Sequence, residues 1–192
     1  EEGEGTENPG EVAPVIPTYV PTIELNKVTT IGDNALQGCI NIKSITIPDN
    51  VTSLGSYAFS GCSTLSSVNV SASSKLQSIG QQAFRLTKNL KDIDFSQTSH
   101  LESIGNYAFN ESYITSISLP ASLKTIGLYA FKDCQSLTSF ASVANIADYA
   151  FDGCRALKHV TIQEGATSIG KYAFQKCSAL ESISLPESLT SI

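Results

Sequence analysis

The chain of 192 residues repeats one short unit, and the clearest marker of the repeat is an Ala-Phe dipeptide. Its six copies are Ala58-Phe59, Ala83-Phe84, Ala108-Phe109, Ala130-Phe131, Ala150-Phe151 and Ala173-Phe174, with Ala35-Leu36 as a variant in front. Successive Ala residues lie 23, 25, 25, 22, 20 and 23 positions apart. A unit this short cannot bury its own apolar face, so a chain built from such units folds by stacking them into a solenoid.

The residues around the dipeptide repeat as well. In most units an aliphatic-Gly pair such as Ile79-Gly80 precedes the Ala, and a small polar or thiol side chain stands three positions after the Phe. An alternating stretch follows, which is typical of a short half-buried strand. The expected strands cover residues 45–47, 68–70, 93–95, 117–119, 160–162 and 183–185, with 140–142 as the weakest copy. We expect each unit to run through a strand, a turn, an extended return and one helical turn.

The consensus aliphatic-Gly-x-Tyr-Ala-Phe-x-x-Cys-x-x-Leu, followed by Ser-Ile-x-Ile-Pro, resembles the BspA-like leucine-rich-repeat family over about residues 23–192. We predict an α/β repeat solenoid with about seven repeats of 20–25 residues. In this right-handed leucine-rich-repeat coil, a curved parallel sheet forms the concave face. Short helical turns and extended segments form the convex face. The resemblance implies a bacterial protein that is secreted or exposed at the cell surface and that adheres to host or neighbouring-cell macromolecules.

The first part of the chain differs from the repeats in composition. Residues 1–22 are rich in Glu, Gly and Pro, so we expect a flexible acidic linker before the repeat domain of residues 23–192. Five of the first eleven residues are Glu, and without them the net charge of −6 becomes −1. A nearly neutral domain without a basic stretch argues against nucleic-acid binding. No apolar run approaches the roughly 18–20 residues of a membrane span, so we expect no membrane insertion of this segment.

All five Cys residues share the position three after the Phe of the dipeptide, or after Leu36 in the variant unit. They are Cys39, Cys62, Cys134, Cys154 and Cys177. Disulfide bridges or a metal site are one interpretation, and a column of buried thiols is the other. Thr87 and Ser112 occupy the same position in two units, which favours a small side chain that hydrogen-bonds the backbone. The long spacings do not suit zinc-ligand pairs, and we expect no cofactor and no metal.

A stripe of Tyr residues stands directly before the Ala in five units. Its members are Tyr57, Tyr107, Tyr129, Tyr149 and Tyr172. One interpretation is an aromatic strip that contacts a carbohydrate or a protein. The other is packing on the convex side with the hydroxyls reaching water.

The concave face of the expected sheet carries mostly small uncharged side chains. Asp92 and Asp94 interrupt this pattern on one strand, and His159 interrupts it further along the array. Departures from a uniform surface are plausible ligand contacts, and ordinary variation of a solvated face is the alternative. The candidate ligand-binding residues are Asn69, Asp92, Asp94, His159 and Thr161.

The sequence favours a binding protein over an enzyme. It contains only two His residues, and it has no nucleophile-elbow, phosphate-loop or dinucleotide motif. We expect a recognition module whose concave face binds an extracellular protein or glycan. The alternative is a structural spacer that displays or assembles other domains. Ile192 falls where the next aliphatic-Gly step is due, without a polar capping repeat, so we also expect self-association through this uncapped end.

Overall fold

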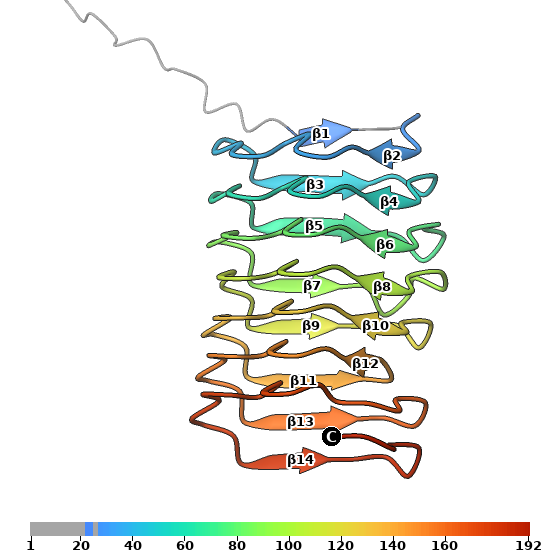
Figure 1. The fold of residues 1–192 in the computed structure, drawn as a ribbon. Coiled ribbons are helices and arrows are strands. Elements are labelled where there is room, and N and C mark those ends of the chain that lie inside the picture. Colours follow the sequence, from blue (N-terminus) through green and yellow to red (C-terminus); the bar gives the residue numbers. More distant parts are fainter. Residues whose placement is uncertain (1–21, 25–26) are drawn as a thin grey trace, which may run out of the picture.

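The computed structural model describes residues 22–24 and 27–192, so most of the expected linker of residues 1–22 lies outside the described residues. The described chain winds into a stack of about seven coils (Figure 1). The longer strands are β1 (Thr22–Glu24), β3 (Ser44–Ile47), β5 (Ser67–Val70), β7 (Asp92–Asp94), β9 (Ser116–Ser118), β11 (Ser139–Ser142), β13 (His159–Ile162) and β14 (Ser182–Ser184). The two-residue strands are β2 (Thr30–Ile31), β4 (Ser53–Leu54), β6 (Ser78–Ile79), β8 (Ser103–Ile104), β10 (Thr125–Ile126) and β12 (Asn145–Ile146).

The two sets of strands form separate parallel columns on the stack. The longer strands follow one another in chain order and are hydrogen-bonded in three groups, β1-β3-β5, β7-β9 and β11-β13-β14. The short strands form one six-stranded sheet in the order β12-β10-β8-β6-β4-β2. Each coil therefore pairs with the next coil along the chain, which confirms the predicted solenoid of parallel strands. The segment 140–142, expected to be the weakest strand, instead forms most of β11 and pairs with β13 over four residues.

The predicted helical turns are wrong, because no helix occurs among the described residues. In the second unit, the N–H groups of Tyr57, Phe59 and Gly61 donate to carbonyls of the next coil at 2.8 Å. The N–H groups between them close turns within the coil, as when Ser60 donates to the Tyr57 carbonyl at 3.0 Å. An α-helix needs every N–H for its own i−4 carbonyl. The left-handed φ of 59° at Tyr57 also interrupts any right-handed helical run.

The core is a continuous column inside the coils. The Phe residues of the dipeptides stack on one another, with ring centroids 5.0–5.3 Å apart, from Phe59 to Phe174. The inward residues of the longer strands, such as Ile45 and Val160, are buried against this column. Burying one such side chain stabilises the fold by roughly 1.5–3 kcal/mol. Because these contacts join neighbouring coils, the core forms only when the coils stack.

Candidate functional site

The outward side chains of the longer strands form one exposed surface, which we call the strand face. Alternation along each strand buries one side chain and exposes the next, as in the exposed-buried-exposed pattern of β7. The five predicted ligand-binding residues are all exposed on this face. They are Asn69 on β5, Asp92 and Asp94 on β7, and His159 and Thr161 on β13.

The five residues do not form one cluster. Asn69 and Asp94 hold equivalent positions on the neighbouring strands β5 and β7. His159 and Thr161 lie on β13, with β9 and β11 between them and β7 (Figure 1). Three strand steps correspond to roughly 14 Å. The strand face therefore carries two separate polar groups joined by a stretch of Ser and Ala side chains.

Both aspartates of β7 take part in the fold itself. The Oδ1 atom of Asp92 accepts hydrogen bonds from the Ser116 hydroxyl at 2.6 Å and from the Thr115 hydroxyl at 3.0 Å. These bonds hold the pKa of Asp92 below its usual value, the Ser116 bond most of all. Asp94 accepts a bond from the Ser96 N–H at 2.8 Å, which closes a turn after β7. Sequence reasoning identified their exposure and missed these contacts.

The group on β13 has mixed charge. The Nδ1 atom of His159 lies 3.0 Å from the Ser182 hydroxyl on β14. The Glu181 carboxylate lies 4.0 Å from His159 Nε2 and 3.7 Å from Lys158 Nζ. All three charged or titratable side chains are more than half exposed. This group therefore offers both donors and acceptors to a partner.

The Tyr stripe becomes a ladder of stacked rings on the surface. The Tyr ladder consists of Tyr107, Tyr129, Tyr149 and Tyr172, with ring centroids 4.8–5.0 Å apart. Tyr57 stands apart, because Gln82 occupies the intervening coil and donates to the Tyr57 hydroxyl at 2.9 Å. Rings that stack on one another cover each other's faces, so the ladder offers mainly ring edges and hydroxyls. Partial burial and the neighbouring phenols raise the pKa of Tyr149.

The structure supports the thiol column. All five Cys are free thiols. Four of them donate to the carbonyl of the Phe or Leu in the preceding coil at 2.9–3.2 Å, namely Cys62, Cys134, Cys154 and Cys177. Burial raises the pKa of Cys134 to about 12 and that of Cys62 and Cys177 to about 11, so these thiols stay protonated and unreactive near neutral pH.

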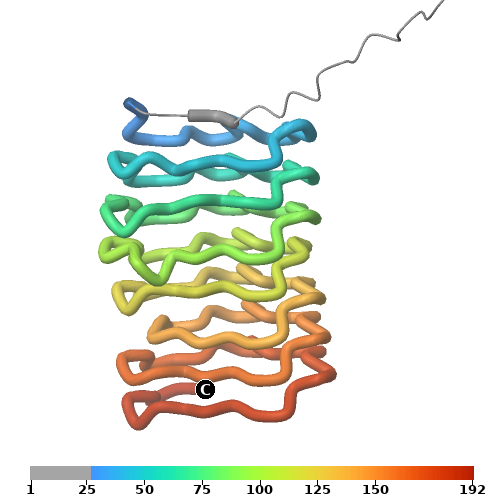
Figure 2. Tube along the Cα trace, turned by 180° about the vertical axis from the view of Figure 1, so that it is seen from behind, coloured from blue at the N-terminus to red at the C-terminus, as the bar shows by residue number. Residues whose placement is uncertain are grey.

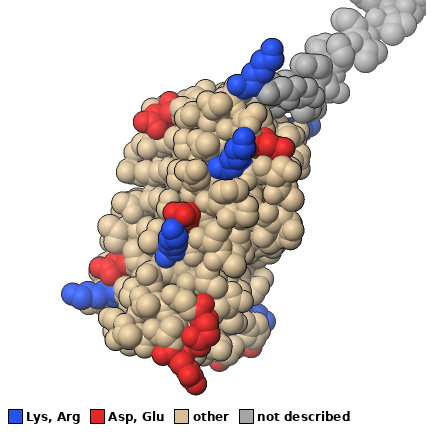
Figure 3. Space-filling view, turned by 90° about the vertical axis from the view of Figure 1, so that its right-hand side faces the viewer, with Lys and Arg blue, Asp and Glu red and all other residues tan. Residues whose placement is uncertain are grey.

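A notch in the stack was not anticipated from the sequence. Only residues 143–144 join β11 to β12, whereas residues 119–124 join β9 to β10, so the edge of this coil is recessed (Figures 1 and 2). The resulting hollow has a volume of about 600 Å³ and is lined in part by Lys124, Val143 and Glu164. The 20-residue spacing between Ala130 and Ala150 was the sequence signal for it. Around it, the edge of the stack carries scattered charges of both signs and no extended patch of one sign (Figure 3).

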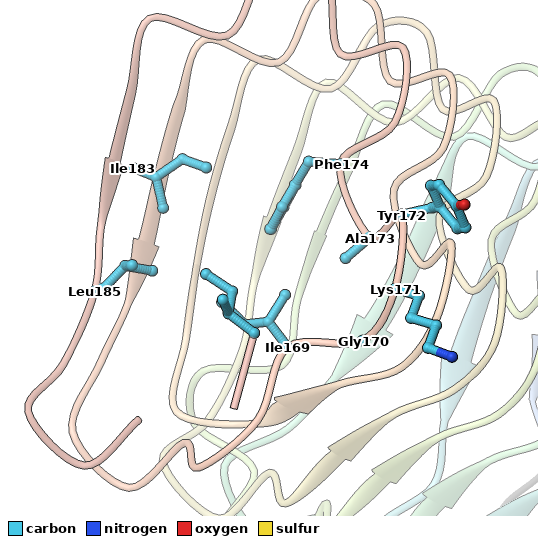
Figure 4. A pocket seen from close by; sticks show the side chains of 9 residues that line it. Ile169, Gly170, Lys171, Tyr172, Ala173, Phe174, Ile183 and Leu185 are labelled. Atoms are coloured by element: carbon cyan, nitrogen blue, oxygen red, sulfur yellow. The ribbon is translucent and has the colours of Figure 1, made fainter. Parts of the chain in front are cut away.

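The C-terminal end of the stack is apolar. A cavity of about 620 Å³ opens there, and it is lined by the side chains that the next coil would cover. Ile169, Phe174, Ile183 and Leu185 converge on it, and Tyr172 stands at its rim (Figure 4). Ile183 is 41% exposed and Leu185 46%, whereas the equivalent Val160 and Ile162 of the preceding coil are buried.

Comparisons with known proteins agree with this architecture. The family model of the BspA type leucine rich repeat region matches six copies over residues 18–138 and 102–192. A leucine-rich-repeat protein of T. pallidum is 30% identical, with a TM-score of 0.71, over 80% of this chain and 72% of its own. A leucine-rich-repeat protein from Bacteroides ovatus is 32% identical, with a TM-score of 0.73, over 84% of this chain and 42% of its own.

More distant similarity shows the fold alone. The pneumococcal vaccine antigen PcpA is 21% identical, with a TM-score of 0.56, over 84% of this chain and 57% of its own. The chain thus spans less than two thirds of two of these three solved structures. A comparison with curated proteins gives no match. The family that matches is a repeat region, and it indicates no catalytic activity.

Proposed function

Because the chain belongs to the BspA-type leucine-rich-repeat family, we propose that it is a non-catalytic recognition module that binds an extracellular protein or glycan through the strand face. The observation that carries this proposal is the strand face itself. Its exposed side chains are mostly hydroxyls, and they repeat at the spacing of parallel strands, about 4.8 Å. Such a rigid array presents many donors and acceptors in fixed positions.

The two polar groups distinguish two parts of the strand face from the rest of this otherwise uniform surface. Asp92 and Asp94 place two carboxylates on β7, while Lys158, His159 and Glu181 mix charges beside β13. A partner that spans both groups must reach across roughly 14 Å. Contacts of this kind are individually weak, so we expect modest affinity unless several copies act together. The proposed setting is the bacterial cell surface or the secreted state, in keeping with the family.

Membrane insertion finds no support among the described residues, none of which belongs to a helix long and apolar enough to cross a bilayer. The proposal concerns recognition by the coils alone.

A binding screen against immobilised extracellular-matrix proteins, mucins and glycans tests the proposal. The key variant carries Asp92→Ser, Asp94→Ser and His159→Ser, and its fold is checked by circular dichroism, since both aspartates hold hydrogen bonds. The matched control is Glu102→Ser with Glu187→Ser, which removes an equal number of negative charges from exposed positions outside the strand face. Saturable binding that only the strand-face variant loses supports the proposal. If the parent chain, the strand-face variant and the control variant bind equally, the binding site lies outside these residues. The Tyr ladder is then the next surface to mutate.

The second candidate is a structural spacer that displays or assembles other domains. The regular hydrogen bonding between coils favours it, because every junction joins the next coil in nearly the same way. A spacer needs no individual side chain on the strand face. Absence of any saturable partner, together with unchanged behaviour of the strand-face variant, would support this candidate.

A further inference from the structure

We propose that a small pocket beside the turns of three neighbouring coils binds one neutral sugar residue, at a site separate from the strand face. This turn pocket has a volume of about 270 Å³. Pockets for drug-sized ligands have roughly 300–1,000 Å³, so the turn pocket suits a ligand of a single ring. Its lining consists of two residues from each coil, namely Leu86 and Lys88, Glu111 and Tyr113, and Asp133 and Gln135.

The repeat arranges these six residues in two rows. The first row stands two positions after the Phe of each dipeptide and contains Leu86, Glu111 and Asp133. The second row stands four positions after the same Phe and contains Lys88, Tyr113 and Gln135. Equivalent positions on neighbouring coils are separated by about one strand spacing, roughly 4.8 Å. The turn pocket therefore draws on three successive coils and depends on their stacking.

The first row has a backbone conformation that favours glycine. The φ angles of its three residues lie between 56° and 59°. Glycine holds the same position in three other units, at Gly38, Gly61 and Gly153. A side chain makes this left-handed conformation less favourable than it is for glycine. Since the coils with glycine stack in the same way, stacking does not require the side chains of Leu86, Glu111 and Asp133.

A chain of hydrogen bonds holds one carboxylate of the turn pocket in place. Arg85 donates from Nη2 to Glu111 Oε1 at 3.2 Å and from Nε to Asn110 Oδ1 at 3.1 Å. Asn110 is buried, and its Nδ2 atom donates to the Lys132 carbonyl of the next coil at 2.9 Å. These bonds engage only Oε1 of Glu111, which leaves Oε2 for a ligand. An acceptor fixed in advance lowers the entropic cost of binding.

Tyr113 gives the turn pocket an aromatic surface. Its side chain is 44% exposed, and Lys91 Nζ lies 5.4 Å from the centroid of its ring. This cation–π contact restrains the ring. Tyr113 and Leu86 together offer apolar surface to the C–H groups of a sugar, while the neighbouring polar side chains can bind its hydroxyls. Apolar surface with a few polar groups is typical of small-molecule sites.

The charges around the turn pocket favour a neutral ligand. The positive charges of Arg85 and Lys88 balance the negative charges of Glu111 and Asp133. A ligand with a net charge therefore gains little overall attraction and meets a like charge on one side. The carboxylates accept hydrogen bonds, Lys88 donates them, and the Gln135 amide does both. Sugar hydroxyls also donate and accept, so they can pair with each of these groups.

NMR titration of the ¹⁵N-labelled whole chain tests the proposal, with the methyl glycosides of glucose, galactose, mannose and N-acetylglucosamine as probes. We expect at least one glycoside to shift the amide signals of Tyr113 and Gln135 saturably, with a Kd on the order of 1 mM, the weak end of specific affinity. The pocket variant carries Glu111→Gly and Asp133→Gly. Glycine fits the left-handed backbone, so we expect this variant to fold, which thermal unfolding checks. Its binding should weaken by about tenfold or more, because hydrogen bonds to two charged groups are lost.

The matched control is Lys176→Gly. Lys176 holds the equivalent position in another unit, has a φ of 57° and does not line the turn pocket. This control and the strand-face variant should both bind the glycoside like the parent chain, so the outcome is independent of the strand face. Absence of a saturable shift with all four glycosides would overturn the proposal. Equal binding by the parent chain and the pocket variant would overturn it too, as would binding of acetate or free glycine in place of the glycosides.

Discussion

A methyl group on Gly80 would lie 2.6 Å from the carbonyl carbon of Gly55 in the preceding coil. The φ angle of Gly80 is not left-handed, so the conflict is one of space and not of backbone conformation. The three atoms that this methyl group would meet are the carbonyl carbon and oxygen of Gly55 and the carbonyl oxygen of Leu54, all of them backbone atoms. Gly80 N–H itself donates to the Leu54 carbonyl at 2.8 Å. The glycine column thus sets how closely the coils stack.

Gly80→Ala is expected to lower the free energy of unfolding by about 1–3 kcal/mol, the usual cost of overpacking. Gly32→Ala is the matched control, because its methyl meets no described atom within 4 Å. Urea denaturation of the two variants and the parent chain measures the difference. Equal stability of both variants would show that the coils separate at little cost.

Native thiol accessibility should distinguish one cysteine from the other four. Cys39 is partly exposed, whereas Cys62, Cys134, Cys154 and Cys177 are buried. A thiol reagent added to the folded chain is therefore expected to label about one of the five thiols quickly, and all five after denaturation. Mass spectrometry counts the labels and locates them. Rapid labelling of Cys134 in the folded state would contradict the buried column.

Stability should fall at alkaline pH because the buried thiols resist ionisation. An unfolded thiol ionises near 9.0, whereas the pKa of folded Cys134 is about 12. Between these values the unfolded chain binds fewer protons than the folded chain, so the free energy of unfolding decreases as pH rises, by roughly 1 kcal/mol per pH unit for one such thiol. This contribution is complete below pH 9 and is lost on the way to the folded pKa.

The comparison of Cys134→Ser with the parent chain isolates this effect. Ser112 occupies the equivalent position of the preceding coil, so the structure accepts a hydroxyl there. Other alkaline groups, such as Lys and Tyr, are common to both proteins and cancel. Urea denaturation at several pH values should give a shallower alkaline decline for Cys134→Ser. Parallel declines would mean that Cys134 ionises as readily when folded as when unfolded.

Ser116→Ala should raise the pKa of Asp92 toward its usual value, since the Ser116 hydroxyl is the main cause of its lowering. Carbon-detected NMR titration of the Asp92 carboxyl group measures the change. Ser118→Ala is the control, because Ser118 pairs with Asp94 along β9 and not with Asp92. If both variants leave the pKa of Asp92 unchanged, the hydrogen bond from the Ser116 hydroxyl is not the cause of its lowering.

Periodicity made most of the fold predictable. Side chains such as Phe84 and Ile93 recur at fixed offsets, and this recurrence identifies the buried column, the strands and the stacking direction. The sequence predicts a helical turn at the Ala-Phe segment, because the local sequence does not reveal that Phe59 donates its N–H to another coil. The strength of β11 was also hidden, since Phe140 and Ala141 gain their order from pairing with Val160 and Thr161.

The candidate site was predictable only in part. Strand alternation gives the exposure of Asp92 and His159, because a period of two fixes which side chains face outward. It does not give the hydroxyls of Thr115 and Ser116 that bind Asp92, which come from the next coil. The notch around Val143 is not predicted from the sequence, for a related reason. The repeat spacing shows that this unit is short, but only the three-dimensional structure shows that the edge of its coil is recessed.

The confinement of core contacts and backbone hydrogen bonds to adjacent coils also sets how the molecule responds to a pulling force. A coil in the stack adds about 5 Å to its length, whereas its 20–25 residues span roughly 65–90 Å when drawn out. A load along the axis can therefore detach the terminal coil without disturbing the coils behind it. Under tension the chain would lengthen in discrete steps, one coil at a time, and rewind when the load is released.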